Sequence, residues 1–208
     1  MSIDPFILSQ TQLLTLIQSN TMKKNAYTLI LFFLSISFSF CQEHTTLLKK
    51  LEAFKNSDQY NTVEHEILNA SKNILFQPFS VKDKDKMDAI KAVDRWLVYT
   101  GDYTFPVMGK LYNAIKNDEY LVSLYKTSMV NYILDQKLNY NRIITCNINP
   151  PKGKTYLEQN DVRELHYEAA VILIKFLKEN KELDQGKDFK NIVNAYDEKN
   201  LREVLFES

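Results

Sequence analysis

Few residues of this chain have types and neighbours suited to chemistry. His166 borders the apolar stripe of a strongly helix-forming segment, and a histidine next to a carboxylate can act as a general base. Asp102 or Asp161 could supply that carboxylate, and Cys146 could supply a nucleophile. These residues are far apart along the chain, so only the fold could bring them together. A hydrolase is therefore the minor alternative, and we expect His166 to be a structural residue at the edge of the core.

The composition argues against several common kinds of site. The four glycines are widely spaced, whereas a phosphate-binding loop needs several of them within a few residues. The nucleophile pattern G-x-S-x-G is also absent. Glu64, His65 and Glu66 are consecutive, and consecutive side chains of a helix diverge instead of closing on one ion. The 26 basic residues are balanced by 26 acidic ones, which gives no broad positive field for nucleic acid. We predict no metal, no other cofactor and no nucleic-acid partner.

A segment at residues 137–160 interrupts the helical pattern, and its prolines and glycine predict one long irregular loop. Ile143, Ile144 and Cys146 are expected to anchor this loop to the core. Basic and aromatic side chains alternate along it, and they make up most of the predicted binding set: Tyr140, Arg142, Lys152, Lys154 and Tyr156. Positive charge beside stacking faces could bind an anionic glycan or a partner protein of the cell envelope. The favoured interpretation is a solvated basic loop without a ligand.

The hydrophobic segment near the N-terminus predicts where the protein works. Two lysines precede an uncharged run over residues 26–40, and the run ends in small residues at Ser39 and Cys41. These are the three regions of a secretory signal peptide. We therefore predict a signal peptide over residues 22–41, preceded by an upstream extension (1–21) and followed by a single helical domain (42–208). The mature protein is expected to be exported to the periplasm or secreted.

Two features refine this prediction. The uncharged run is shorter than the roughly 20 residues that a transmembrane helix needs, so no transmembrane span is expected in the mature chain. Lipidation at Cys41 is the less favoured alternative to a soluble product, because a lipobox needs a small residue where this chain has Phe40. After cleavage only Cys146 remains, so an internal disulfide is not available.

Apolar residues recur at helical spacing through most of the remaining chain, which predicts an all-α fold. The expected helices cover residues 44–57, 62–76, 83–100, 107–116, 118–136, 161–180, 188–196 and 201–206. Short connections between them favour a stack of antiparallel helix pairs, repeat-like in shape although no clear repeat is present. Ser80 and Asp83 suggest a capping box, Gly101 a left-handed helix end, and Pro106 the start of the next helix.

The junction after the third of these helices carries a motif. Its residues are Trp96, Leu97, Thr100, Asp102, Tyr103, Thr104 and Phe105. This stretch resembles an uncharacterised family of exported all-helical proteins from Gram-negative bacteria, with the pattern W-[LM]-x-x-T-x-D-Y-[ST]-F. The resemblance implies an all-helical fold and export, and it implies no activity. Tyr103 and Phe105 complete the predicted binding set, although a packed turn is the favoured interpretation of this motif. The best overall prediction is an exported helical binding domain.

Overall fold

The computed structural model describes residues 43–77, 82–147, 149–150, 152–180 and 186–207. The predicted upstream extension and signal peptide lie outside these residues, as does Ser80. The chain divides into two compact units, residues 1–43 and 44–208, and the second contains nearly all of the described structure.

The described residues form nine α-helices and one short 3-10 helix, with no strand among them. The α-helices are α2 (Glu43–Glu52), α3 (Ser57–Asn61), α4 (Glu64–Phe76), α5 (Lys84–Tyr99), α6 (Gly109–Ile115), α7 (Glu119–Tyr140), α8 (Asn160–Glu179), α9 (Lys187–Asp197) and α10 (Leu201–Phe206), and the 3-10 helix is η2 (Tyr156–Glu158). The prediction of an all-α protein is confirmed. None of these helices is long and apolar enough to cross a membrane.

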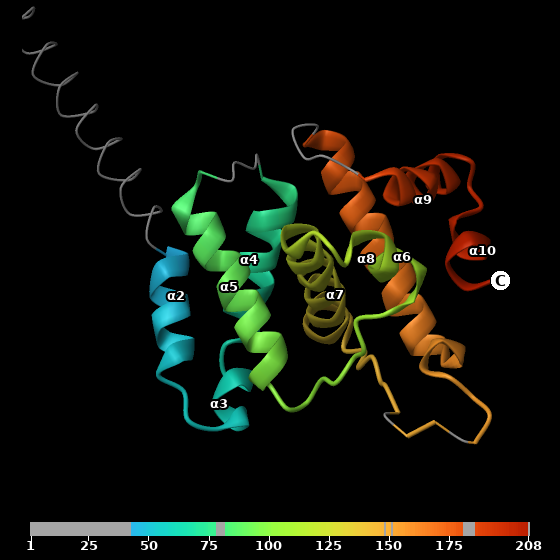
Figure 1. The fold of residues 1–208 in the computed structure, drawn as a ribbon. Helices are drawn as coiled ribbons and strands as arrows, with labels where there is room; N and C mark the ends of the chain where they lie inside the picture. The colour runs from blue at the N-terminus through green and yellow to red at the C-terminus, as the bar shows by residue number, and fades with distance from the viewer. Residues whose placement is uncertain (1–42, 78–81, 148, 151, 181–185, 208) are drawn as a thin grey trace, which may run out of the picture. The chain divides into compact units, whose positions relative to one another are not determined.

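Helix α7 lies between α4 and α5 on one side and α8 on the other (Figure 1). It can do so because apolar side chains cover more than one of its faces; those buried are Leu121, Leu124, Met129, Val130, Ile133 and Leu134. Two polar contacts set its direction against α4. The Lys137 ammonium donates to Glu64 at 2.8 Å, and the Asn131 amide donates to the Ser71 hydroxyl at 3.0 Å. The two helices are therefore antiparallel.

Helices α4 and α5 also form an antiparallel pair. Lys86, in the first turn of α5, donates to the carbonyls of Asn73 and Gln77 at the end of α4. This contact satisfies carbonyls that a helix end leaves without partners. At the other end of the pair, the Trp96 indole donates to the Tyr60 carbonyl at 3.0 Å, and Trp96 is fully buried.

Some helix ends agree with the sequence and others differ. The Asp118 carboxylate caps α7. The Asp83 carboxylate is itself the cap of α5, whereas the predicted capping box has Ser80, outside the described residues, as the cap. Gly101 has φ +73°, the left-handed conformation expected after a helix. The prediction that Pro106 opens the next helix is wrong. Helix α6 begins at Gly109 because the preceding residue, Met108, has extended backbone angles.

Two other helix boundaries differ from the prediction. The first predicted helix ends at Glu52, and a separate short helix, α3, follows it with a capping box formed by Asn56 and Gln59. Helix α7 continues past the predicted end at Gln136 to Tyr140, where Asn141 ends it with φ 52°. The first four residues of the predicted loop are therefore helical.

Candidate functional site

Tyr103 and Phe105 lie in the core, at the junction between α5 and α6. The Tyr103 ring packs 5.7 Å from the Trp96 ring and 6.3 Å from the Phe105 ring, centre to centre. The Lys137 ammonium lies 5.6 Å from the centre of the Tyr103 ring. Both side chains are buried, so neither forms an open binding surface.

The polar residues of the same motif hold α3 against the end of α5. Asn61 donates to the Asp102 carboxylate at 2.7 Å and accepts from the Thr100 hydroxyl at 3.2 Å. Asp102 is thus part of a helix junction. These contacts support the interpretation of the motif as a packed turn.

Arg142 is engaged within the chain. Its guanidinium donates to both oxygens of Glu164, at 2.5 and 2.8 Å, and to Asp161 at 3.3 Å. The Tyr132 hydroxyl donates to the same Glu164 carboxylate. A bidentate guanidinium–carboxylate pair fixes geometry as well as charge. Arg142 therefore fastens the start of the loop to the first turns of α8.

This contact leads to a testable prediction. The Arg142 guanidinium and then the Tyr132 hydroxyl lower the pKa of Glu164 to about 2. In Arg142→Ala the pKa of Glu164 should rise toward about 4, its ordinary value. Side-chain NMR titration measures it, and amide exchange at Thr145 and Asn147 should quicken in the same variant. Lys152→Ala is the matched control, and an unchanged Glu164 pKa in Arg142→Ala would contradict the assignment.

The next residues of the loop are also held by α8. Asp161 accepts from both the amide and the hydroxyl of Thr145, each at 2.9 Å. The Gln159 side chain accepts from the Asn147 amide and donates to the Asn147 carbonyl. Ile144 is buried between these contacts. The loop thus has a defined conformation as far as Asn147.

Two apolar side chains point outward from this fixed stretch. Tyr140, in the last turn of α7, is 69% exposed, and Ile143 is 63% exposed. The expectation that Ile143 anchors the loop is wrong, whereas Ile144 does anchor it and Cys146 is half-buried. These two exposed side chains, held on a fixed backbone, form a candidate contact surface.

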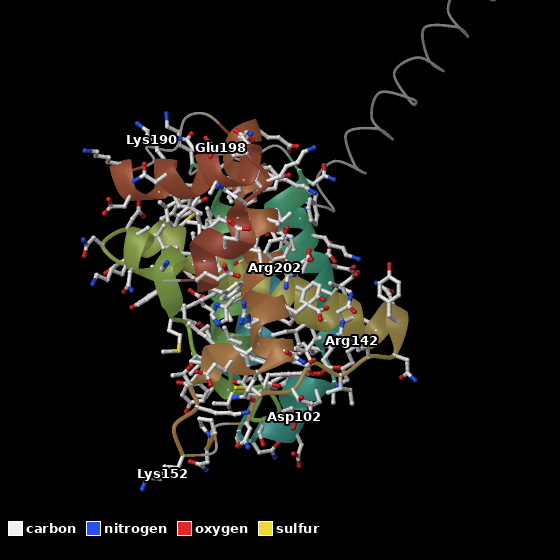
Figure 2. All side chains as sticks on the ribbon, turned by 90° about the vertical axis from the view of Figure 1, so that its right-hand side faces the viewer. Asp102, Arg142, Lys152, Lys190, Glu198 and Arg202 are labelled. Carbon is white, nitrogen blue, oxygen red and sulfur yellow. The ribbon has the colours of Figure 1, made fainter. Side chains whose placement is uncertain are left out.

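The other basic residues of the predicted set lie elsewhere. Lys152 and Lys154 are exposed near the far end of the loop, and Tyr156 is half-buried in η2. Lys152 lies well apart from Arg142 (Figure 2). The predicted binding residues therefore do not form one basic patch.

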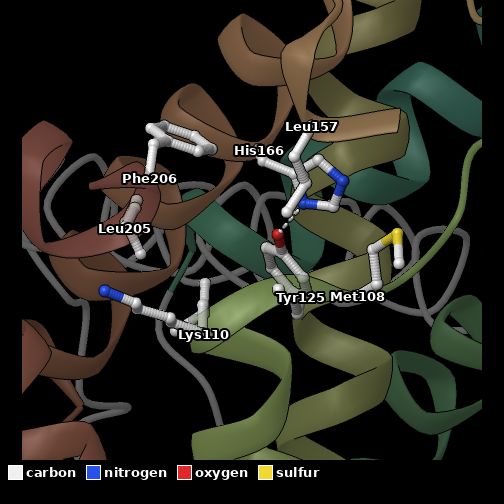
Figure 3. Close-up of a pocket in the computed structure, with 9 residues that line it drawn as sticks. Met108, Lys110, Tyr125, Leu157, His166, Leu205 and Phe206 are labelled. Carbon is white, nitrogen blue, oxygen red and sulfur yellow. Dashed lines mark hydrogen bonds between the residues drawn. The ribbon is translucent and has the colours of Figure 1, made fainter. Parts of the chain in front are cut away.

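His166 lines a small pocket with residues of α6, α7, η2 and α10 (Figure 3). The Tyr125 hydroxyl lies 2.5 Å from the imidazole Nδ1, and both side chains are buried. Among the described residues, the imidazole Nε2 has no hydrogen-bond partner that meets the geometric criteria. Burial lowers the pKa of His166 to about 4, and the Pro106 carbonyl opposes this shift. A neutral imidazole whose Nδ1 accepts from Tyr125 fits these surroundings.

The pocket does not bring together the parts of a hydrolase. Its lining residues are Met108, Gly109, Lys110, Leu111, Tyr125, Leu157, His166, Leu205 and Phe206. Neither Cys146 nor a carboxylate is among them, and the internal volume is about 10 Å³, the space of one water molecule. Burial raises the pKa of Cys146, which disfavours a reactive thiolate. Among the described residues, no group of three or more His, Cys, Asp and Glu side chains is arranged to hold a metal ion.

Comparison with known proteins gave no relative. No protein-family model matches the chain, and neither the curated proteins nor the solved structures contain a match. The resemblance of residues 96–105 to an exported helical family stays a prediction.

Proposed function

We propose that this protein is an exported helical domain that binds a protein partner or glycan through residues 139–147, here called the recognition segment. The observation that carries the proposal is the way α8 fixes this segment. Arg142, Thr145 and Asn147 are each bonded to α8 or the residue before it, while Tyr140 and Ile143 face outward. A loop already held in one conformation loses little entropy on binding.

In this proposal the helices form a rigid support for the recognition segment. We propose that the antiparallel packing of α4, α5, α7 and α8 is a stack of helix pairs, repeat-like in shape, that presents the recognition segment at one end of α7. Binding residues are often carried on loops that a rigid scaffold positions.

Export is part of the proposal and rests on the N-terminal sequence. Two lysines, the uncharged run over residues 26–40 and the small residues Ser39 and Cys41 support it. The intact mass of the native protein tests it: a chain starting near Gln42 supports export, and a retained leader contradicts it.

The binding proposal is tested by affinity capture from the native source with the full chain as bait. Wild type should recover a stoichiometric protein or glycan, and the double variant Tyr140→Ser/Ile143→Ser should recover less than about a tenth of it, as expected for loss of central contact residues. Val98→Ser is the matched control, because Val98 is 68% exposed on α5 and lies outside the recognition segment.

Each outcome is decisive for the proposal. Loss of the ligand in the double variant with retention in Val98→Ser supports it. Equal recovery by all three proteins, or no specific ligand with wild type, contradicts it.

A further inference from the structure

Helix α10 forms one wall of the pocket at His166 (Figure 3). Leu205 and Phe206 of this helix line the pocket together with the imidazole. The helix has only six residues, and a helix this short depends on its packing contacts to stay folded. The other short walls are tied to the core, because α6 follows the buried Phe105 and η2 leads directly into α8. Helix α10 is therefore the wall that can detach with the smallest loss of contacts.

Positive groups border α10. They are Arg163 of α8, 4.8 Å from the centre of the Phe206 ring, Arg202, 4.5 Å from the centre of the Tyr167 ring, and Lys110, whose ammonium donates to the Glu207 carbonyl at 2.8 Å. Contacts of this kind at the protein surface are weak, because water competes with them. Burial of Leu201 and Leu205 therefore supplies most of the attachment of α10.

A positive charge on the imidazole would be unpaired in this pocket. Besides His166, the titratable groups among the described lining residues are the Lys110 ammonium of α6 and the Tyr125 hydroxyl of α7, and the residues from η2 and α10 are apolar. Glu164 and Glu168 lie two positions to either side of His166 on α8, and side chains at that spacing do not face each other. Covering an unpaired charge is costly, so protonation disfavours the closed pocket.

We propose that α10 is an acid-released lid: protonation of His166 favours its detachment from α6 and α8, so that water reaches the imidazole. This inference is independent of the proposed binding function. Detachment hydrates the charge while the core of α4, α5, α7 and α8 stays packed. In the closed form burial lowers the pKa of His166 to about 4, although the Pro106 carbonyl opposes this shift. In the open form the imidazole regains a pKa of about 6.5.

Amide hydrogen exchange of the full chain, followed by NMR at pH 7 and pH 5, tests the lid. The reporter is the Val204 amide, which is bonded to the Asn200 carbonyl. After correction for intrinsic exchange rates, its protection should fall about twentyfold between the two pH values, the ratio that follows from a His166 pKa of about 4 when closed and about 6.5 when open. At both pH values it should be at least about tenfold less protected than the amide of Leu173 in α8, because α10 opens without the core.

Variants at two histidines assign the proton. In His166→Gln, whose side chain does not titrate, the change in Val204 protection between pH 7 and pH 5 should be less than about threefold. His65→Gln is the matched control, because His65 is exposed on α4 and its replacement should leave the twentyfold change intact. A change that persists in His166→Gln, or a Val204 amide as protected as that of Leu173 in wild type, overturns the proposal.

A second variant decides the question if His166→Gln does not fold. Leu205→Ala loosens α10, so the pKa of His166, measured by NMR titration of the imidazole, should rise from about 4 toward 6.5. The reason is that the linkage between lid opening and protonation is reciprocal. Glu203→Ala is the control, since Glu203 is exposed on α10 and its replacement should leave this pKa at about 4. A pKa that Leu205→Ala does not raise overturns the lid.

Discussion

Replacing Trp96 by alanine should lower the free energy of unfolding by about 4 kcal/mol, the usual cost of truncating a fully buried tryptophan. Trp96 is 0% exposed and packs against Tyr103 in the junction between α5 and α6. The substitution also leaves the Tyr60 carbonyl without the indole donor. Because a domain has only about 5–15 kcal/mol of stability in total, this loss is large. Urea denaturation followed by circular dichroism measures it.

Two further variants separate the causes of this effect. Trp96→Phe keeps much of the packing and loses the hydrogen bond, so its cost should lie near half that of Trp96→Ala. Tyr99→Ala, on the same helix and half exposed, should cost less than about 1.5 kcal/mol. A Trp96→Ala protein as stable as Tyr99→Ala would show that the junction is not part of the core.

The second large effect is a loss of folding stability in acid that depends on His166. Its pKa is about 4 in the folded protein and about 6.5 when unfolded, so between these pH values the unfolded chain binds a proton that the folded chain does not. The contribution of His166 to stability is therefore complete above pH 6.5 and is lost as the pH falls through 4. The loss should amount to about 3 kcal/mol.

The measurement compares wild type with His166→Gln by urea denaturation at several pH values. Subtracting the two curves removes the contributions of other titrating groups, among them Asp94 and Glu168, whose pKa values burial raises. The difference should slope between about pH 6.5 and pH 4 and be flat above it. Parallel curves for the two proteins would show that His166 titrates normally.

The helices were predictable because they depend on local spacing. The apolar stripe of α8 is visible in the sequence, and the structure confirms it. Helix α3 was missed because five residues are too short for periodicity to show. Its signal was the capping pair Asn56 and Gln59.

The candidate site was only partly predictable because it depends on contacts between distant residues. From the sequence, Arg142 was predicted to bind a ligand. Only the fold places Glu164 and Asp161 against its guanidinium. Ile143 and Ile144 are the same residue type, and which of them faces the core depends on how α8 holds the loop. The partner of His166, Tyr125, is 41 positions away, so no local pattern in the sequence could reveal it.

The contacts that hold the recognition segment against α8 do not include Gly153, which lies further along the loop. Asn147 and Gln159 bond to each other and close the base of the loop between them, and a side chain added at Gly153 would meet no atom within 4 Å. Lengthening a surface loop costs little, because closure entropy grows only with the logarithm of its length. An epitope tag or fluorescent label inserted at Gly153 should therefore leave the recognition segment in place, which makes this position a practical handle for following the protein.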